Sequence, residues 1–386
     1  EWTDKFLRLL EGTSEIAYDD IVFYSKLGEG AFGEVWRAQL WDMDVAVKKL
    51  KGTLLHDSVV TELAEEVALL RSLRHPNCVL FLGFTKPPHF CIVTEFMALG
   101  SMRSILENTR VRMSARTVIK CALAIARGMN YLHTQSPAIL HRDLNSHNIL
   151  CHDNWTVKVA DYGLSSLMTT EPARERQKAW GDTSAELEVA RSPGGGRQMA
   201  AAQFVGAIPW RAPEATTTHF LPASDVFSFG MVLWELVTRR TPFDCGKVGG
   251  AGRMLAIRGQ IKAGVRPPLP DSCTPILRRL IESCWSAEPE VRPTFHAIIE
   301  TLKPYESLAN TTLTRWDTCD FTFVKHKPPV QYGVPDANLN ASDPHGEECI
   351  DCISSDLLVF SERQMVANCW SSFLLSGKDQ RGFCLL

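Results

Sequence analysis

The stretch of sequence that decides the fold reads His141-Arg142-Asp143-Leu144-Asn145-Ser146-His147-Asn148-Ile149-Leu150, followed further on by Asp161-Tyr162-Gly163. It supplies an aspartate, an asparagine five residues later, and a second aspartate thirteen residues beyond that. One carboxylate can orient a hydroxyl nucleophile while the amide and the second carboxylate hold magnesium, which is the division of labour that phosphoryl transfer needs. Apolar runs at 138–140 and 157–160 predict short strands beside this polar loop. Any single member could occur by chance, but the spacing of the whole set indicates a phosphotransfer site.

The bulk composition is that of an ordinary globular protein. The chain has 386 residues, of which 45% are hydrophobic and 22% are charged, so it can form two or three cores. A formal net charge of -3 offers no general attraction to nucleic acid or to an anionic membrane. The most apolar run, 227–237, is too short to span a bilayer and contains Glu235. We therefore expect no nucleic-acid partner and no membrane insertion.

Two features of the sequence indicate whether the chain is part of a longer protein and in which compartment it lies. The first residue is Glu1 rather than Met and no secretory leader is visible, which predicts a piece of a longer protein with upstream regulatory domains. Twelve cysteines lack the spacing of a disulfide framework, and those before residue 300 lie in apolar surroundings. This pattern predicts reduced core thiols and a cytoplasmic location.

The N-terminal part of the chain alternates in the manner of strands. The alternating segments are residues 21–24, 34–38 and 45–47. Gly28, Gly30 and Gly33 lie between the first two. A lone G-x-G-x-x-G is weak evidence and usually indicates a dinucleotide fold, in which a helix follows. Here a second strand follows, so the glycines are predicted to form a hairpin tip over phosphate groups.

Residues 59–73 have apolar side chains at helical spacing, and Glu66 lies on the apolar side. A glutamate there needs a partner, and Lys48 at the end of the third strand is the predicted one. The alternative is that Lys48 is an ordinary solvated lysine. Further strands are expected at 79–84 and 90–93, so a five-stranded sheet and one helix precede residue 97. The helices expected after it are 118–133, 225–239, 277–284 and 294–302.

The motifs occur in a distinctive order. They are the Gly-rich hairpin, Val45-Ala46-Val47-Lys48, Glu66, His141-Arg142-Asp143, Asp161-Tyr162-Gly163 and Ala212-Pro213-Glu214. In this order the chain resembles the eukaryotic protein kinases from about residue 20 to 305. Segments 18–21, 81–83 and 208–214 look like the tyrosine-kinase-like group, with Raf and mixed-lineage kinases as cousins, and 141–148 looks most like LIM kinases.

The resemblance implies an α+β, bilobal protein kinase fold. Its N-lobe, residues 20–97, would hold the five-stranded antiparallel sheet and one helix, and its C-lobe, 98–305, would be mainly α-helical. The activation segment would be 161–214, between an N-terminal extension, 1–19, and a low-order tail, 306–386. The implied activity is transfer of a phosphoryl group from ATP, with Mg²⁺, to hydroxyl groups of protein substrates.

The resemblance also implies the site residues. The catalytic ones would be Asp143, Lys48, Glu66, Asn145 and Arg142, and the metal ligands Asn148 and Asp161. The nucleotide-binding ones would be Leu27, Gly28, Gly30, Gly33, Val35, Ala46, Lys48, Thr94, Glu95, Met97 and Leu150. In addition, Leu70, Phe81, His141 and Tyr162 would form an apolar column. Glu214 and Arg292 would form a buried ion pair, and Asp225 would cap the backbone of the catalytic loop.

Three positions depart from the family pattern. Asn145 stands where serine/threonine kinases have lysine, and Ala207 stands where they have threonine or serine. The arginine and proline typical of tyrosine kinases are replaced by His147 and Ala207. The choice between Ser/Thr and Tyr hydroxyls therefore stays open. Tyr162 in place of phenylalanine adds a hydroxyl that needs a partner. Loss of the lysine also leaves open a kinase fold that binds ATP as a scaffold.

The long segment 164–211 is predicted to be disordered in its middle, 171–199. Phosphorylation by an activating kinase, followed by pairing with Arg142, could order it. The hydroxyls concerned are Ser165, Ser166, Thr169, Thr170, Thr183, Ser184 and Ser192. A Gly-rich insert at 246–252 could alter docking. Cys349 and Cys352 form a C-x-x-C without a matching second pair, which is weak evidence for zinc.

Overall fold

The computed structural model describes residues 15–29, 33–50, 67, 70–86, 89–162, 207–216, 219–244 and 251–306. Nearly all of them belong to one compact unit, Glu1–Cys273 with Leu277–Val330, and Thr274–Ile276 belong to a second. The predictions for Gly30, Glu66, the hydroxyls named as possible phosphorylation sites, segment 171–199 and the tail with its C-x-x-C concern residues outside the described ones.

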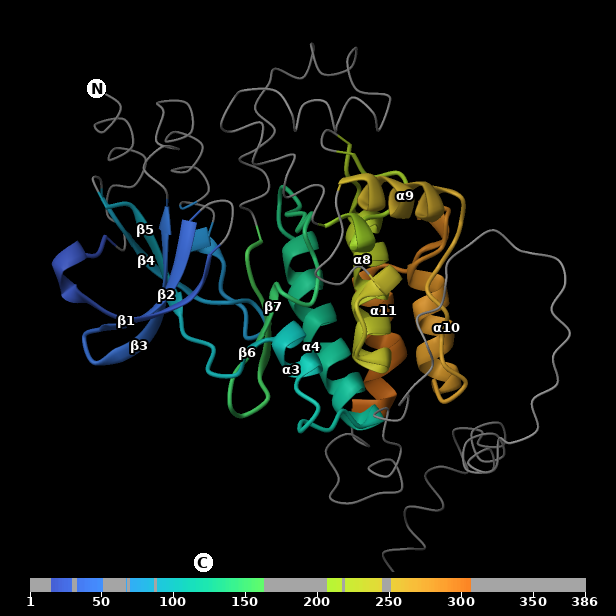
Figure 1. The fold of residues 1–386 in the computed structure, drawn as a ribbon, viewed down its shortest axis with the longest axis horizontal. Helices are drawn as coiled ribbons and strands as arrows, with labels where there is room; N and C mark the ends of the chain where they lie inside the picture. The colour runs from blue at the N-terminus through green and yellow to red at the C-terminus, as the bar shows by residue number, and fades with distance from the viewer. Residues whose placement is uncertain are drawn as a thin grey trace, which may run out of the picture. The chain divides into compact units, whose positions relative to one another are not determined.

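A five-stranded antiparallel sheet forms the N-terminal part (Figure 1). Its strands are β1 (Ile21–Glu29), β2 (Gly33–Leu40), β3 (Met43–Leu50), β4 (Phe81–Thr85) and β5 (Cys91–Glu95), in the order β1-β2-β3-β5-β4. The predicted sheet is confirmed. Of the predicted helix at 59–73, the described residues 67 and 70–72 are helical.

The two faces of this sheet differ in burial. One face carries a buried apolar cluster that includes Ala38, Val45, Val47 and Val93. On the other face Val35 pairs with Lys48, and Ala46 pairs with Thr94. Paired residues, and residues two apart on a strand, point to the same face. These four half-buried side chains therefore share one surface, which is the surface that the predicted nucleotide site requires.

A small second sheet adjoins residues 141–148, which we call the catalytic loop after the role predicted for them. It consists of β6 (Gly100–Ser101), β7 (Ile149–Cys151) and β8 (Val157–Val159). The strand expected at 157–160 is confirmed as β8, but the one expected at 138–140 is wrong. Within the described residues that run pairs with no strand; its Ile139 is buried instead, and the Ile139 N–H donates to the Leu132 carbonyl (3.0 Å) at the end of a helix.

The remainder of the described chain is mainly helical. The helices are α3 (Met102–Glu107), α4 (Ala115–His133), α8 (Pro222–Thr238), α9 (Ala251–Lys262), α10 (Pro275–Cys284) and α11 (Phe295–Leu302), with 3-10 turns η1 (Tyr18–Asp20), η4 (Ile208–Trp210), η5 (Pro242–Asp244), η6 (Pro289–Val291) and η7 (Lys303–Tyr305). The four expected helices are confirmed with small shifts at their ends. Helices α3 and α9 were not predicted: α3 is short, and α9 contains Gly252 and Gly259.

Helix α8 is the centre of the helical part. Every residue from Ser224 to Val237 is buried, in agreement with its apolar sequence. A Cβ on Gly230 would come within 2.9 Å of the Cys284 Cβ, so glycine is needed where α8 and α10 meet. The helix also carries two buried carboxylates, Asp225 and Glu235, which organise the site described below.

The expected ion pair between Glu214 and Arg292 is present. Arg292 donates to both carboxylate oxygens of Glu214, at 2.7 and 2.9 Å, and its side chain is fully buried. Burial acts to raise the pKa of the Glu214 carboxyl, but the hydrogen bonds from Arg292 and Ser224 outweigh it and lower the pKa. The pair joins the segment before α8 to the turn before α11.

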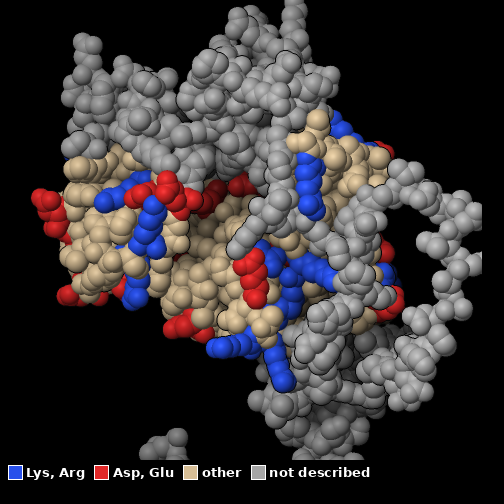
Figure 2. Space-filling view, in the orientation of Figure 1, with Lys and Arg blue, Asp and Glu red and all other residues tan. Residues whose placement is uncertain are grey.

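Six cysteines lie in the described part, and all are buried and unbridged, as the sequence predicted. Among the described helices, none combines the length and apolarity that crossing a bilayer demands. Figure 2 shows acidic and basic side chains close to one another on the visible face of the described residues.

Removing one partner of the buried pair should destabilise the fold. Arg292→Met leaves the partly buried Glu214 carboxylate without its cation, so we expect the free energy of unfolding to fall by about 3–5 kcal/mol. Urea unfolding followed by circular dichroism measures this. The control is Lys303→Met, which breaks an exposed pair with Glu300 (3.4 Å) and should cost about 0–1 kcal/mol. Equal losses in the two variants would contradict the bracing role.

Candidate active site

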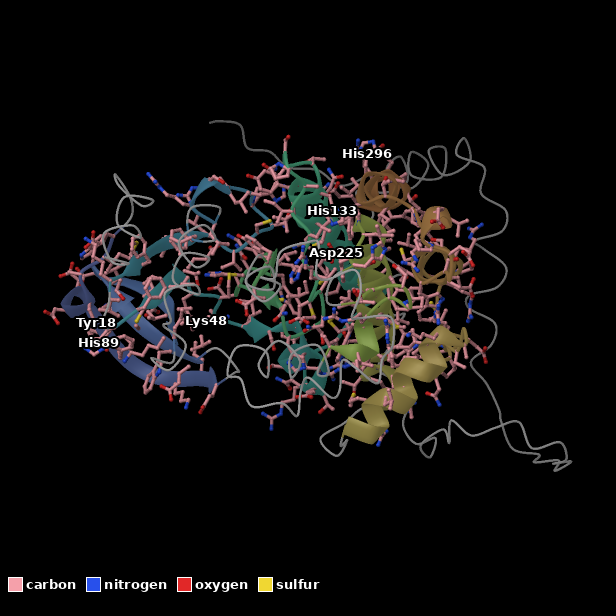
Figure 3. All side chains as sticks on the ribbon, turned by 90° about the horizontal axis from the view of Figure 1, so that it is seen from above. Tyr18, Lys48, His89, His133, Asp225 and His296 are labelled. Carbon is pink, nitrogen blue, oxygen red and sulfur yellow. The ribbon has the colours of Figure 1, made fainter. Side chains whose placement is uncertain are left out.

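The backbone of the catalytic loop is held by one carboxylate from α8. Asp225 accepts the N–H of His141 at Oδ2 and the N–H of Arg142 at Oδ1, both at 2.9 Å. The ring of His133 on α4 lies 2.8 Å from the same Oδ2 (Figure 3). Arg142 has φ 64°, a left-handed conformation that is costly for a residue other than glycine. The two hydrogen bonds to Asp225 stabilise this conformation, as the predicted cap requires.

His141 connects this loop to the second aspartate. Its Nδ1 accepts the N–H of Asp143 (3.3 Å), and its Nε2 lies 3.0 Å from the carbonyl of Ala160. A carbonyl can only accept, so the ring carries a proton on Nε2 and none on Nδ1. Ala160 directly precedes Asp161, and therefore His141 fixes the two motifs relative to each other. His141 and Tyr162 are both buried, as are Leu70 and Phe81 of the expected column.

The Asp143 carboxylate is oriented by two amides. Asn145 donates from Nδ2 to Oδ1 of Asp143 (2.9 Å), and Asn148 donates from Nδ2 to Oδ2 (3.0 Å). Both amides also donate to the Asp143 backbone carbonyl, at 3.0 and 2.8 Å. The Asn145 oxygen in turn accepts the N–H of His147 (2.9 Å). Asn145 therefore takes part in fixing the carboxylate, a contact that the sequence alone did not predict.

Lys48 reaches across from the sheet to Asp161. Its Nζ lies 3.2 Å from each carboxylate oxygen, and the Lys48 side chain is 16% exposed against 51% for Asp161. This ion pair was not predicted. The predicted pairing of Lys48 with Glu66 stays a prediction, because Glu66 lies outside the described residues.

The sheet face described above carries several of the residues expected to bind the nucleotide. Along the register Gly28 pairs with Val35, which pairs with Lys48. A Cβ on Gly33 would lie 1.8 Å from the Lys49 carbonyl, so the backbone admits only glycine there. A Cβ on Gly28 would meet no atom of the described residues within 4 Å. Leu150 packs against a cluster of Val79, Met97 and Ala160, and Leu27 is half exposed.

The donor set suits Mg²⁺ bound together with phosphate groups. Asp161 and Asn148 offer carboxylate and amide oxygens, which are the ligands that Mg²⁺ prefers. Within the described part of the chain, no three His, Cys, Asp or Glu side chains gather in a way that could hold a metal. A cation bound by one or two protein oxygens, with water and phosphate as further ligands, fits this set.

Glu95 is tied down at the strand end expected to face adenine. Lys158 on β8 donates to both carboxylate oxygens of Glu95, at 2.7 and 2.8 Å, and the Leu80 N–H donates to one of them (2.6 Å). This pair was not predicted. The Glu95 carboxylate therefore links β5 to β8 and to the segment before β4, while the nucleotide binding that the resemblance implies for Glu95 would use its backbone groups.

The hydroxyl of Tyr162 has the partner that the sequence said it needs. It donates to the Val79 carbonyl at 2.6 Å, and Tyr162 is 3% exposed. Burial raises the pKa of the phenol well above its ordinary value. Tyr162 is therefore a neutral hydrogen-bond donor that links the start of the activation segment to the segment before β4.

Beneath the catalytic loop lies Glu235, which is fully buried. Its Oε1 accepts from Ser146 Oγ (2.7 Å) and Arg103 Nη1 (3.4 Å), and its Oε2 accepts from Trp210 Nε1 (2.7 Å). Burial raises the pKa of this carboxyl to about 7, against the effect of these donors. One carboxylate thus joins α3, the catalytic loop and η4, an arrangement that sequence reasoning missed because only an apolar helix was visible there.

The chain is similar to known protein kinases over most of its length. The protein kinase domain model matches residues 21–302. Serine/threonine-protein kinase CTR1 of Arabidopsis thaliana is 36% identical over 296 residues, which is 75% of this chain and 32% of the relative. Probable serine/threonine-protein kinases SIS8 of the same plant and drkD of Dictyostelium discoideum are 35% and 33% identical over 293 and 291 residues. Each match covers 75% of this chain but only 25% and 20% of those relatives, respectively.

The pH dependence of stability should report the buried carboxyl of Glu235. Its folded pKa of about 7 lies above the ordinary 4.5, so its contribution to stability is full below pH 4.5 and is lost as pH rises through 7. Between pH 5 and 8, the free energy of unfolding of the wild type, measured with urea, should fall by about 3 kcal/mol more than that of Glu235→Gln, whose side chain cannot ionise. Glu282→Gln, at an exposed position, is the control. Parallel pH curves for the wild type and Glu235→Gln would contradict the assignment.

Proposed function

The chain belongs to the protein kinase family, and from this premise we propose that it transfers the γ-phosphoryl group of ATP to serine or threonine hydroxyls of protein substrates. The relatives named above are serine/threonine kinases, and they agree with the resemblance to the tyrosine-kinase-like group. The matched region makes up a third or less of those relatives, so the substrates and partners of the whole protein are part of the proposal.

One observation carries the proposal: the orientation of the Asp143 carboxylate by two neutral amides. Each carboxylate oxygen accepts one amide N–H and keeps further capacity as an acceptor. Asp143 can therefore accept the hydrogen bond of a substrate hydroxyl and take its proton as the new P–O bond forms. Because Asn145 and Asn148 are neutral, they orient Asp143 without adding the positive charge that a lysine at position 145 would place beside it.

The remaining polar residues would serve the nucleotide. Mg²⁺ with ATP supplies the phosphoryl group and neutralises part of its charge. Asn148 and Asp161 are the proposed metal ligands, and Lys48 is the proposed contact to the phosphates. Its present ion pair with Asp161 supports this, because it brings a cation from the sheet to the metal-binding carboxylate. Arg142 is proposed to meet a phosphate added to the activation segment by another kinase.

The adenine ring would lie on the half-buried face of the sheet. Val35, Ala46 and Leu150 would sandwich it, with Leu27 at the edge and Thr94 at the back. Backbone groups of Glu95 and Met97 would bind its edge. Gly28, Gly30 and Gly33 would cover the phosphates, and Glu66 would pair with Lys48. We also propose a cytoplasmic location, which the free buried thiols support.

A kinase fold that only binds ATP is the second candidate, and the absence of lysine at position 145 favours it. That lysine would neutralise charge on the transferring phosphoryl group, so its loss predicts reduced turnover. The amide contact of Asn145 with Asp143 argues for transfer, because it keeps the base in a defined orientation.

A transfer assay separates the two functions. Purified protein with ATP and Mg²⁺ should phosphorylate Ser and Thr members of a peptide library, and Tyr members to a smaller extent or not at all. Asp143→Ala, Lys48→Met and Asp161→Asn should each lower transfer by about 10³-fold or more, with unfolding curves close to wild type. Wild-type protein that binds ATP but labels no peptide would support the scaffold. Variants as active as the wild type would contradict the residue roles.

A further inference from the structure

Arg258 on α9 is the largest fully buried side chain of the described residues, at 1% exposure. The helix buries little else: Ile257 and Ile261 flank Arg258, and most of the remaining described positions of α9 are exposed. A guanidinium is always charged and costs free energy to bury unless its N–H groups are satisfied. Its position therefore needs an explanation that packing alone does not provide.

The guanidinium donates to the backbone of one short segment. Nη1 donates to the carbonyl of Ala212 (2.6 Å) and lies 3.5 Å from that of Arg211, while Nη2 donates to those of Ala215 (2.5 Å) and Pro213 (3.1 Å). Four carbonyl groups within five consecutive residues thus surround one planar guanidinium group. Lysine cannot reproduce this arrangement, because its ammonium is a compact donor without the spread of the guanidinium.

We call residues 207–216 the anchor segment. At its other end, Trp210 donates to Glu235, which also accepts from Ser146 of the catalytic loop. The Trp210 ring meets the ring of His147 edge-on at 6.5 Å, and His147 is exposed four positions after Asp143. Two helices therefore bind the anchor segment: Arg258 of α9 donates to its backbone carbonyls, and Glu235 of α8 accepts from its Trp210 side chain. It borders the exposed side of the loop that carries Asp143.

We infer that Arg258 is a positioning residue for the protein substrate. By fixing the carbonyls of residues 211–215, it sets where the anchor segment stands beside His147, and so the path along which a polypeptide brings its hydroxyl to Asp143. This role rests on the proposed phosphotransfer function. Because the four hydrogen bonds described above all end on the anchor segment, Arg258 acts on the substrate polypeptide and not on the nucleotide face of the sheet.

The test uses Arg258→Lys, with Arg253→Lys on the exposed side of the same helix as the matched control. The probe is the fluorescently labelled Ser peptide of the library that the folded wild type binds most tightly in the absence of ATP. Arg258→Lys should raise the KM for the peptide by at least about tenfold, while the KM for ATP and the ATP hydrolysis rate without peptide stay within about twofold. Arg253→Lys should change none of the three. Arg258→Met, which removes all four hydrogen bonds, should act in the same direction and more strongly.

Binding of the same fluorescently labelled peptide, followed by anisotropy without ATP, keeps the inference separate from the proposed function. If the wild type transfers no phosphate, the proposed function fails, yet weaker peptide binding by Arg258→Lys still supports the positioning role. An unchanged peptide KM and affinity in folded Arg258→Lys would overturn the inference. So would equal rises in both KM values, or an Arg258→Lys protein that is unfolded at 25 °C in the absence of urea.

Discussion

The arrangement of the site depends on the two oxygens of Asp225. Buried on α8, they accept the N–H groups of His141 and Arg142 and so hold the catalytic loop in a conformation that includes a left-handed arginine. A non-glycine residue in that region costs about 1–3 kcal/mol and persists only where its surroundings determine it. From this point the chain of contacts runs through His141 to Ala160 and Asp161, and forward to Asp143. Among the described helices, α8 with its run of buried residues thus positions the loop that carries Asp143.

Other buried or partly buried charged side chains also connect separate elements of this fold. Glu235 gathers donors from α3, the catalytic loop and η4, and Glu214 is paired with Arg292. Arg258 donates hydrogen bonds to backbone carbonyls and not to a carboxylate. Such groups are expensive to bury but specify a unique arrangement when their hydrogen bonds are made. In this protein they lie at the junctions where loops meet helices, which is where apolar packing gives the least directional control.

Much of this could be predicted from the sequence, and the rest could not for physical reasons. The alternation and spacing of apolar residues predicted the five strands and four helices, because the period of such a pattern depends only on residues near one another in the sequence. The run at 138–140 was misassigned, because an apolar segment becomes a strand only if it finds a partner. Contacts such as Lys48 with Asp161, 113 residues apart, depend on where two elements meet. The roles of Glu235 and Arg258 could not be predicted, because the partners of a charged residue come from distant parts of the chain and are known only from the three-dimensional structure.

The central claim is that groups from the sheet and from the catalytic loop converge on one nucleotide–metal complex. Calorimetric titration of the folded protein with ATP, with and without Mg²⁺, tests it most directly. For the wild type the account predicts saturable ATP binding that requires Mg²⁺, with a Kd in the roughly micromolar-to-millimolar range. Asp161→Asn should bind ATP much more weakly, and its remaining affinity should be the same with and without Mg²⁺. Absence of ATP binding by the folded wild type, or binding of equal strength with and without Mg²⁺, would contradict it.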